Sequence, residues 1–268
     1  AAIDGLPTAT VRFTAMARVG RAAKVLAISG ADQVGPVDHP LPAPFVVQGT
    51  DAFDNPVEGF AVQWTAVAGG GSIEPATSMT DASGQTSAVG TLGRFPSPMG
   101  EQGELFRARA EGVSDGSAEQ VDFFAAAVAG PPAVFLKEAG DGQGGIPGSA
   151  LPDPLIIRIT DRFGNPVDGV QVAFSADDAS GASIEPAMAS TDEEGLAEAR
   201  AVLGDDPGDF AFEAASDGLP GSPLTFDAVA FPPICSQDGW CWQSPLPQGN
   251  TLNDVYADGS GVLWAVGS

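Results

Sequence analysis

Three pairs of adjacent carboxylates are the residues of this sequence best suited to acid–base chemistry. They are Asp177–Asp178, Glu193–Glu194 and Asp205–Asp206. Two carboxylates held close together can serve as general acid and general base. Each pair, however, stands beside Gly, Ser, Thr or Pro residues that are typical of turns, where acidic side chains are solvated. The pattern therefore favours exposed turns, and no catalytic residue and no enzyme activity are predicted.

The single histidine and one glycine-rich segment are equally weak candidates for a reactive site. His39 lies in a proline-rich stretch, residues 36–44, that indicates an exposed loop, and no Ser-His-Asp arrangement can be built on it. Residues 140–145 contain four glycines but no lysine, and no helical pattern follows them. A phosphate-binding loop is therefore not predicted.

Calcium is the one cofactor that the acidic turns could hold. The segment Asp205–Asp209 places three carboxylates within five residues, and calcium prefers oxygen ligands. The ligand spacing of an EF-hand is absent. The prediction is thus no cofactor and no metal ligand, with calcium-dependent rigidification as the alternative.

The charge of the chain excludes two classes of partner. Its formal net charge is −24, from 35 acidic and 11 basic residues. A protein that binds nucleic acid needs a basic surface, and an anionic membrane would repel this chain. No apolar run reaches the roughly 18 residues of a membrane-spanning helix, so no membrane insertion is predicted within these residues.

One phrase occurs twice and reveals an internal repeat. Asp51–Val57 and Asp161–Val167 share the pattern Asp-Xaa-Phe-Xaa-Asn-Pro-Val, 110 residues apart. A period of this length corresponds to one domain rather than to one turn of a solenoid. Two further phrases recur in the same order, namely Ser72–Ala76 with Ser183–Ala187, and Thr80–Gly84 with Thr191–Gly195.

The repeat predicts how the chain is divided. Residues 2–7 resemble residues 215–220, so residues 1–20 are expected to be the terminal strand of a preceding, truncated copy. Complete copies are expected over residues 21–130 and 131–233, and a different, truncated unit over residues 234–268. Prolines at the copy boundaries, such as Pro131–Pro132, predict a stiff junction.

Short, alternating apolar runs separated by turn residues predict an all-β fold. Phe60, Val62 and Trp64 alternate with polar or small residues, the period of a half-buried strand. Phe174 stands at the place of Trp64 in the second copy, which favours a core anchor over a chemical role. Seven predicted strands in about 100 residues are typical of an immunoglobulin-like sandwich. In the first copy they cover residues 25–29, 45–51, 60–66, 72–80, 85–92, 104–110 and 121–129.

The repeated phrases resemble the bacterial immunoglobulin-like domain of the invasin and intimin type. The resemblance covers about residues 21–233 and the partial copy before them. It implies an extracellular protein, either secreted or on the bacterial surface, in which such domains form a stalk that projects an adhesive tip. That family has no catalytic residues. The insertion at residues 93–103 departs from the second copy and adds loop surface.

The last residues differ in composition and predict another fold. Trp240, Trp242 and Trp264 fall within residues 240–268. Residues 255–266 predict a hairpin, and the run from Trp242 resembles the opening blade of a bacterial β-propeller. In the exported setting that the resemblance implies, Cys235 and Cys241 are expected to form a disulfide. A metal pair is disfavoured because zinc needs four ligands and no further Cys or His is near.

Two functions remain for the chain as a whole. The first is a non-catalytic, semi-rigid stalk whose protein or glycan ligand is bound by regions outside these residues. The alternative is the linker of a larger protein whose propeller binds or processes a glycan or another ligand.

Overall fold

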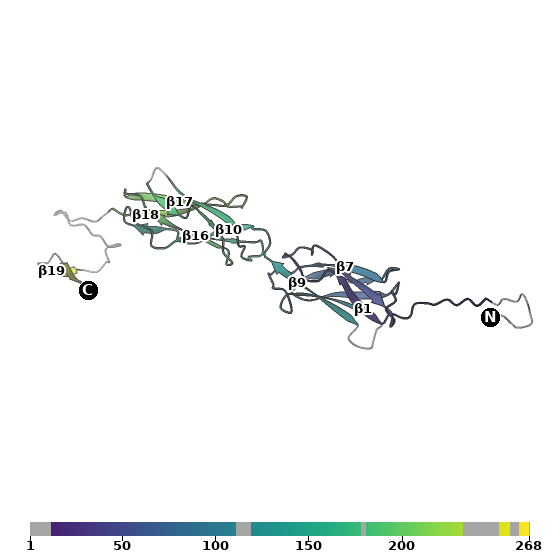
Figure 1. Cartoon of the computed structure of the whole chain (residues 1–268). Helices are drawn as coiled ribbons and strands as arrows, with labels where there is room; N and C mark the ends of the chain where they lie inside the picture. Colours follow the sequence, from purple (N-terminus) through teal and green to yellow (C-terminus); the bar gives the residue numbers. More distant parts are fainter. Residues whose placement is uncertain (1–11, 111–118, 178–180, 233–251, 258–262, 268) are drawn as a thin grey trace, which may run out of the picture. The chain divides into compact units, whose positions relative to one another are not determined.

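The computed structural model describes residues 12–110, 119–177, 181–232, 252–257 and 263–267, and no helix occurs among them (Figure 1). Contacts divide the chain into two units, Ala1–Gly130 (unit 1) and Pro131–Ser268 (unit 2). The predicted all-β class is confirmed. Within the described ranges, no segment has the length and apolarity of a membrane-spanning helix.

Unit 1 is a sandwich of two sheets. Its four-stranded sheet has the order β1-β3-β7-β5, and its five-stranded sheet has the order β2-β9-β8-β4-β6. The strands of the first sheet are β1 (Lys24–Ser29), β3 (Phe45–Thr50), β7 (Gln85–Thr91) and β5 (Ser72–Glu74). Those of the second are β2 (Gln33–Pro36), β9 (Gln120–Val128), β8 (Glu104–Ala110), β4 (Ala61–Ala68) and β6 (Thr77–Met79).

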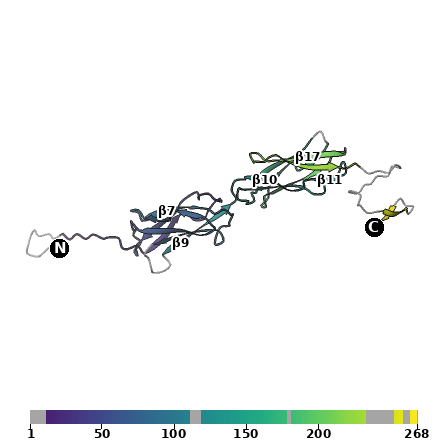
Figure 2. The ribbon, with the colours of Figure 1, turned by 180° about the vertical axis from the view of Figure 1, so that it is seen from behind.

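Unit 2 repeats this topology strand for strand. Its sheets have the orders β10-β12-β16-β14 and β11-β18-β17-β13-β15, and Figure 2 shows β10, β11 and β17 from behind. The first contains β10 (Val134–Ala139), β12 (Leu155–Thr160), β16 (Leu196–Val202) and β14 (Ser183–Glu185). The second contains β11 (Gln143–Gly145), β18 (Leu224–Ala230), β17 (Gly208–Ala215), β13 (Gln171–Ala176) and β15 (Met188–Ser190).

Among the described residues, each sandwich has nine strands where the sequence predicted seven, for two reasons. The single extended segment expected over residues 72–80 is two strands, because Pro75, which has no N–H to donate to a sheet, falls between β5 and β6. β5 pairs with β7 in one sheet and β6 with β4 in the other, so the chain changes sheet there. The other missed strands, β2 and β11, are short and run parallel to β9 and β18.

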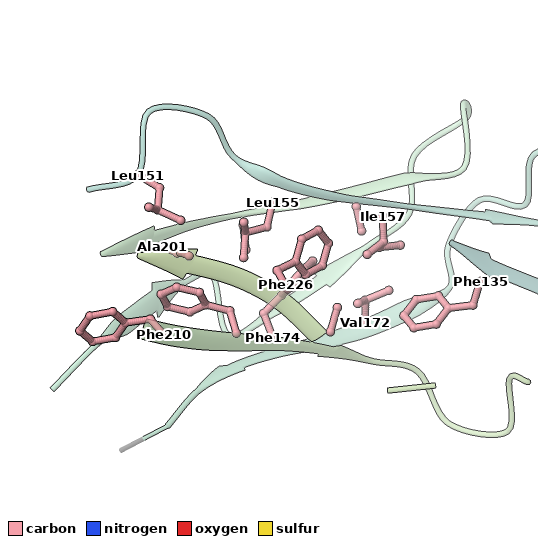
Figure 3. Close-up of a cluster of buried hydrophobic side chains, with 14 of the residues drawn as sticks. Phe135, Leu151, Leu155, Ile157, Val172, Phe174, Ala201, Phe210 and Phe226 are labelled. Carbon is pink, nitrogen blue, oxygen red and sulfur yellow. The ribbon is translucent and has the colours of Figure 1, made fainter. Parts of the chain in front are cut away.

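Aromatic and branched side chains fill the space between the sheets. In unit 1, Phe45 lies 4.6 Å from Phe123 and 5.1 Å from Phe106, measured between ring centroids. In unit 2, Figure 3 shows Leu155 and Ile157 of β12 facing Val172, Phe174 and Phe226 of the other sheet. The alternation that predicted the strands therefore also identified their buried faces.

Trp64 and Phe174 occupy equivalent core positions, as predicted. Each is 3% exposed. The Trp64 indole N–H, the only polar group of that side chain, donates to the Ser78 hydroxyl at 2.7 Å. A satisfied indole and a Phe in the second copy both fit a packing role.

The two ends of the chain carry the remaining described residues. Residues 12–22 form no strand. The assignment of residues 1–20 to a preceding copy therefore stays a prediction. Near the other end, β19 (Leu252–Ala257) pairs antiparallel with β20 (Leu263–Gly267). This pairing agrees with the predicted hairpin and leaves the propeller a prediction.

Candidate functional site

The repeated Asp-Xaa-Phe-Xaa-Asn-Pro-Val phrase forms a turn built around its first carboxylate. Asp51 follows β3, and its Oδ1 accepts hydrogen bonds from the backbone N–H of Phe53 at 2.9 Å and of Asn55 at 3.0 Å. The Asn55 side-chain amide donates to both carboxylate oxygens, at 3.2 and 3.1 Å. A fifth hydrogen bond comes from the Gly20 N–H, which donates to Oδ2 at 2.9 Å.

The second copy has the same geometry. Oδ1 of Asp161 accepts from the N–H of Phe163 at 2.8 Å and of Asn165 at 3.0 Å, and Oδ2 accepts from the Asn165 side-chain amide at 2.8 Å. Asp161 is 1% exposed and Asn165 is 6% exposed. The aspartate and asparagine of the phrase therefore recur because the aspartate holds the turn and the asparagine donates hydrogen bonds to its charge.

These donors determine the protonation of Asp51. The Asn55 side-chain amide, followed by the Gly20 N–H, lowers the pKa of Asp51 from 3.8 to about 2. A carboxylate that accepts this many hydrogen bonds stays ionised and is a poor general base at neutral pH. The distinctive phrase is thus a structural element rather than a reactive one.

The third repeated phrase is also used structurally. The Thr80 hydroxyl accepts from the Phe60 N–H at 2.8 Å and donates to the Val57 carbonyl at 2.6 Å. Thr191 makes the matching bonds with Val170 at 2.9 Å and Val167 at 2.7 Å. Each threonine therefore links the end of the repeated Asp-Xaa-Phe-Xaa-Asn-Pro-Val turn, called the signature turn, to the residue that precedes the next strand.

The aspartates that follow these threonines hold tight turns. Oδ1 of Asp81 accepts from Ser83 N–H at 2.8 Å and from Gln85 N–H at 3.0 Å. The Ser83 hydroxyl, which also donates to Oδ1, is the largest of the interactions that lower the pKa of Asp81. Asp192 accepts from Glu194 N–H and Leu196 N–H at 3.0 and 2.8 Å.

The candidate reactive residues that the structure describes stand on exposed segments. Asp177, Glu193–Glu194 and Asp205–Asp206 are all exposed, while Asp178 lies outside the described residues. His39 is exposed, with Nδ1 2.8 Å from the Val37 carbonyl oxygen, to which its ring N–H donates. The glycine-rich residues 143–145 form β11, an edge strand.

Two other predictions concern bound metal and the cysteines. Within the part of the chain that the structure describes, no three His, Cys, Asp or Glu side chains are grouped to hold a metal ion. These residues include Asp205–Asp209, so the calcium alternative finds no support in the grouping of its carboxylates. Cys235 and Cys241 lie outside the described residues, so their disulfide remains a prediction.

Sequence reasoning missed one residue, a carboxylate buried in unit 1. Glu104, the first residue of β8, is 0% exposed. Trp64 pairs with Ala108, and its counterpart Phe174 pairs with Ala214. Counting back four residues from each alanine shows that Glu104 stands at the position equivalent to Phe210 in the second copy. The signal was available in the sequence, since an acidic residue begins an alternating strand where the other copy has an apolar one.

Three glycines surround the Glu104 carboxylate. Its Oε1 accepts from the Gly93 N–H at 2.8 Å, while Oε2 lies against the backbone of Gly71 and makes no hydrogen bond of good geometry. A Cβ atom placed on Gly69 would lie 2.3 Å from Cδ, and one on Gly71 would lie 2.8 Å from Oε2. Burial raises the pKa of Glu104, and the backbone N–H of Gly93 and the backbone of Gly71 oppose that rise.

The chain is similar in structure to several bacterial surface proteins. An Escherichia coli adhesin, FdeC, is 14% identical over 76% of this chain, with a TM-score of 0.46, and this chain spans 63% of that structure. The D00–D0 domains of intimin are 15% identical over 78% of this chain and 99% of theirs, with a TM-score of 0.39. The Yersinia pseudotuberculosis adhesin InvE is 16% identical over 88% of this chain and 68% of its own, with a TM-score of 0.37.

No protein-family model matches the chain, and no curated protein sequence matches it.

Proposed function

We propose that the chain is a non-catalytic stalk segment of a bacterial surface or secreted protein. The observation that carries the proposal is the use made of the repeated phrases. In both copies their Asp, Asn and Thr side chains form hydrogen bonds that hold turns and strand ends. The residues that recur therefore serve to build a stable module twice.

The site chemistry supports the same function. Asp51, whose pKa is lowered to about 2, accepts several hydrogen bonds, and the buried Glu104 is closed off from solvent. Neither is placed to transfer a proton to a substrate. A stalk needs solubility and stable modules rather than a reactive centre, and the charge of −24 suits an exposed setting.

Small-angle X-ray scattering of the whole chain tests the stalk. A folded domain of about 100 residues has a radius of gyration of about 13 Å. If prolines 131 and 132 stiffen the junction, the longest dimension should approach two such domains placed end to end. Replacing both prolines by glycine should widen the spread of interatomic distances and reduce the average longest dimension. A compact particle for the unaltered chain would refute the proposal.

A second candidate function is that of a linker preceding a β-propeller. The antiparallel pairing of β19 with β20 favours it, because propeller blades are built from such hairpins. The test is the amino-acid sequence that follows Ser268 in the parent protein. At least three further repeats of about 40–50 residues should be found, and their absence would exclude this candidate.

A further inference from the structure

Unit 1 has a hollow of about 380 Å³ beside the loop that the second copy lacks. One side is the Gly69–Gly71 turn between β4 and β5. The other side is formed by Asp38 and by Gly93, Arg94 and Phe95, which follow β7. Sites for small ligands commonly have volumes of about 300–1,000 Å³, so this hollow would admit one or two sugar-sized rings.

The Gly69–Gly71 side of the hollow, called the glycine wall, carries no side chains. Gly69 and Gly70 have φ values of 89° and 81°, which side-chain-bearing residues rarely adopt. Behind the wall, the buried Glu104 carboxylate is in contact with Gly69, Gly71 and Gly93. Glu104 is therefore a positioning residue that supports both glycine segments from within the core.

The rim carries two planar polar groups and an aromatic ring. Arg94 Nε lies 3.8 Å from Asp38 Oδ1, and their side chains are 70% and 36% exposed. Phe95, the next residue, is 70% exposed. A guanidinium and a carboxylate can together bind neighbouring hydroxyl groups, as donor and acceptor respectively. An exposed ring offers a flat apolar surface beside them.

The loop that carries Arg94 and Phe95 is fastened to unit 1. Ser97 and Ala127 exchange two backbone hydrogen bonds, at 2.8 and 3.0 Å, and Gly103 N–H donates to the Gly100 carbonyl at 2.9 Å. In the second copy, Gly204 is followed directly by Asp205–Asp206 and the aromatic residue is missing. The exposed Phe95 is thus a feature of this loop and not of the repeated fold.

We propose that this hollow is a binding site for a neutral saccharide. A sugar ring has an apolar C–H face that Phe95 can cover and vicinal hydroxyls that Asp38 and Arg94 can bind. Asp38 offsets the charge of Arg94, so the hollow itself does not attract anions. The net charge of −24 also disfavours an anionic ligand. The site would give unit 1 a recognition role of its own, which does not depend on the stalk function.

The test is a ¹H–¹⁵N NMR titration of the whole chain with lactose, maltose and N,N′-diacetylchitobiose. At least one should shift the amide signals of Gly69–Gly71 and Gly93, with a dissociation constant of about 0.1–10 mM, since an open hollow buries only part of its ligand. The absence of shifts with all three, or shifts confined to other residues, would overturn the proposal.

Two variants separate the proposed contact from general surface effects. Phe95→Ala should weaken binding about tenfold or more. Phe53→Ala is the matched control, because Phe53 is an 84% exposed phenylalanine in the same unit, on the signature turn. Equal weakening by both variants would refute the site, as would stronger binding of sialyllactose or of an unstructured peptide than of the neutral sugars.

Discussion

Replacing Glu104 by glutamine removes a buried charge together with one carboxylate oxygen that makes no hydrogen bond of good geometry. The amide is almost the same size as the carboxylate, so the three glycines around it can stay in place. Its oxygen can still accept the hydrogen bond from Gly93 N–H. Its NH₂ group replaces Oε2, the atom that makes no hydrogen bond of good geometry, with a donor.

The structure sets the sign and size of the expected effect. A buried polar atom without a hydrogen bond costs about 1–3 kcal/mol. The neutral amide also avoids the cost of burying a charge, which is the effect that raises the pKa of Glu104. Glu104→Gln should therefore stabilise unit 1 at neutral pH by about 1–3 kcal/mol.

The pH dependence gives a second, independent signature. The pKa of Glu104 is raised by burial above its ordinary value of 4.5, so the folded state binds its proton more tightly than the unfolded state does. The stabilising contribution is complete below pH 4.5 and is lost as the pH rises through the raised pKa. Glutamine does not ionise, so the variant should lack this loss, and the two proteins should converge in acid.

Hydrogen exchange of β8, followed by mass spectrometry, measures the difference in unit 1 alone. At neutral pH the slowest β8 amides should exchange roughly 5- to 150-fold more slowly in Glu104→Gln, while those of β17 in unit 2 should not change. Glu101→Gln, three residues away and exposed, makes the same charge change and should have no effect. Faster exchange in Glu104→Gln, or equal effects of both variants, would refute the reasoning.

Three further predictions concern the repeated elements. The Asp51 carboxyl should titrate at about pH 2 by NMR, and the stability it confers should be present above pH 3.8 and lost as the pH falls through about 2, a loss that Asp51→Asn removes. Gly195→Ala should destabilise unit 2 in urea unfolding by more than Gly169→Ala does. Both glycines have φ near +73°, but only at Gly195 would a Cβ lie 2.4 Å from the Ile159 carbonyl oxygen. Equal losses of stability would contradict this prediction. Phe174→Ala should cost about 3–5 kcal/mol and lower only the urea transition of unit 2; a loss below about 1 kcal/mol would argue against a tightly packed core.

The repeat made most of the fold predictable, because the same pattern of apolar and turn residues occurs in both copies. The period of two in residues 60–64 identified both a strand and its buried face, and Phe174 confirmed Trp64 as a core position. The turn at Asp51 could be predicted from residue types, since Asp and Asn favour side-chain hydrogen bonds to their own backbone. These are local effects, which a sequence expresses within a few residues.

Features that depend on distant strands could not be predicted in the same way. The change of sheet at Pro75 requires knowing that β7 and β4 lie on opposite layers, and nothing local to residues 72–80 carries that information. The burial of Glu104 likewise depends on Gly69, Gly71 and Gly93. These glycines belong to two loops that are remote from Glu104 in sequence. An acidic residue at the start of a strand ordinarily faces water, so the local pattern pointed the wrong way, and only the apolar residue at the equivalent position of the second copy signalled the burial.

The two copies also separate residues that build the module from residues that could recognise something. A side chain present in both copies and bonded in the same way in both, such as Asp51 and Asp161, is explained by the fold that the copies share. A ligand-specific feature must instead be sought where the copies differ while their strands match. Glu104 opposite Phe210, and the fastened loop that presents Phe95, meet that condition within unit 1.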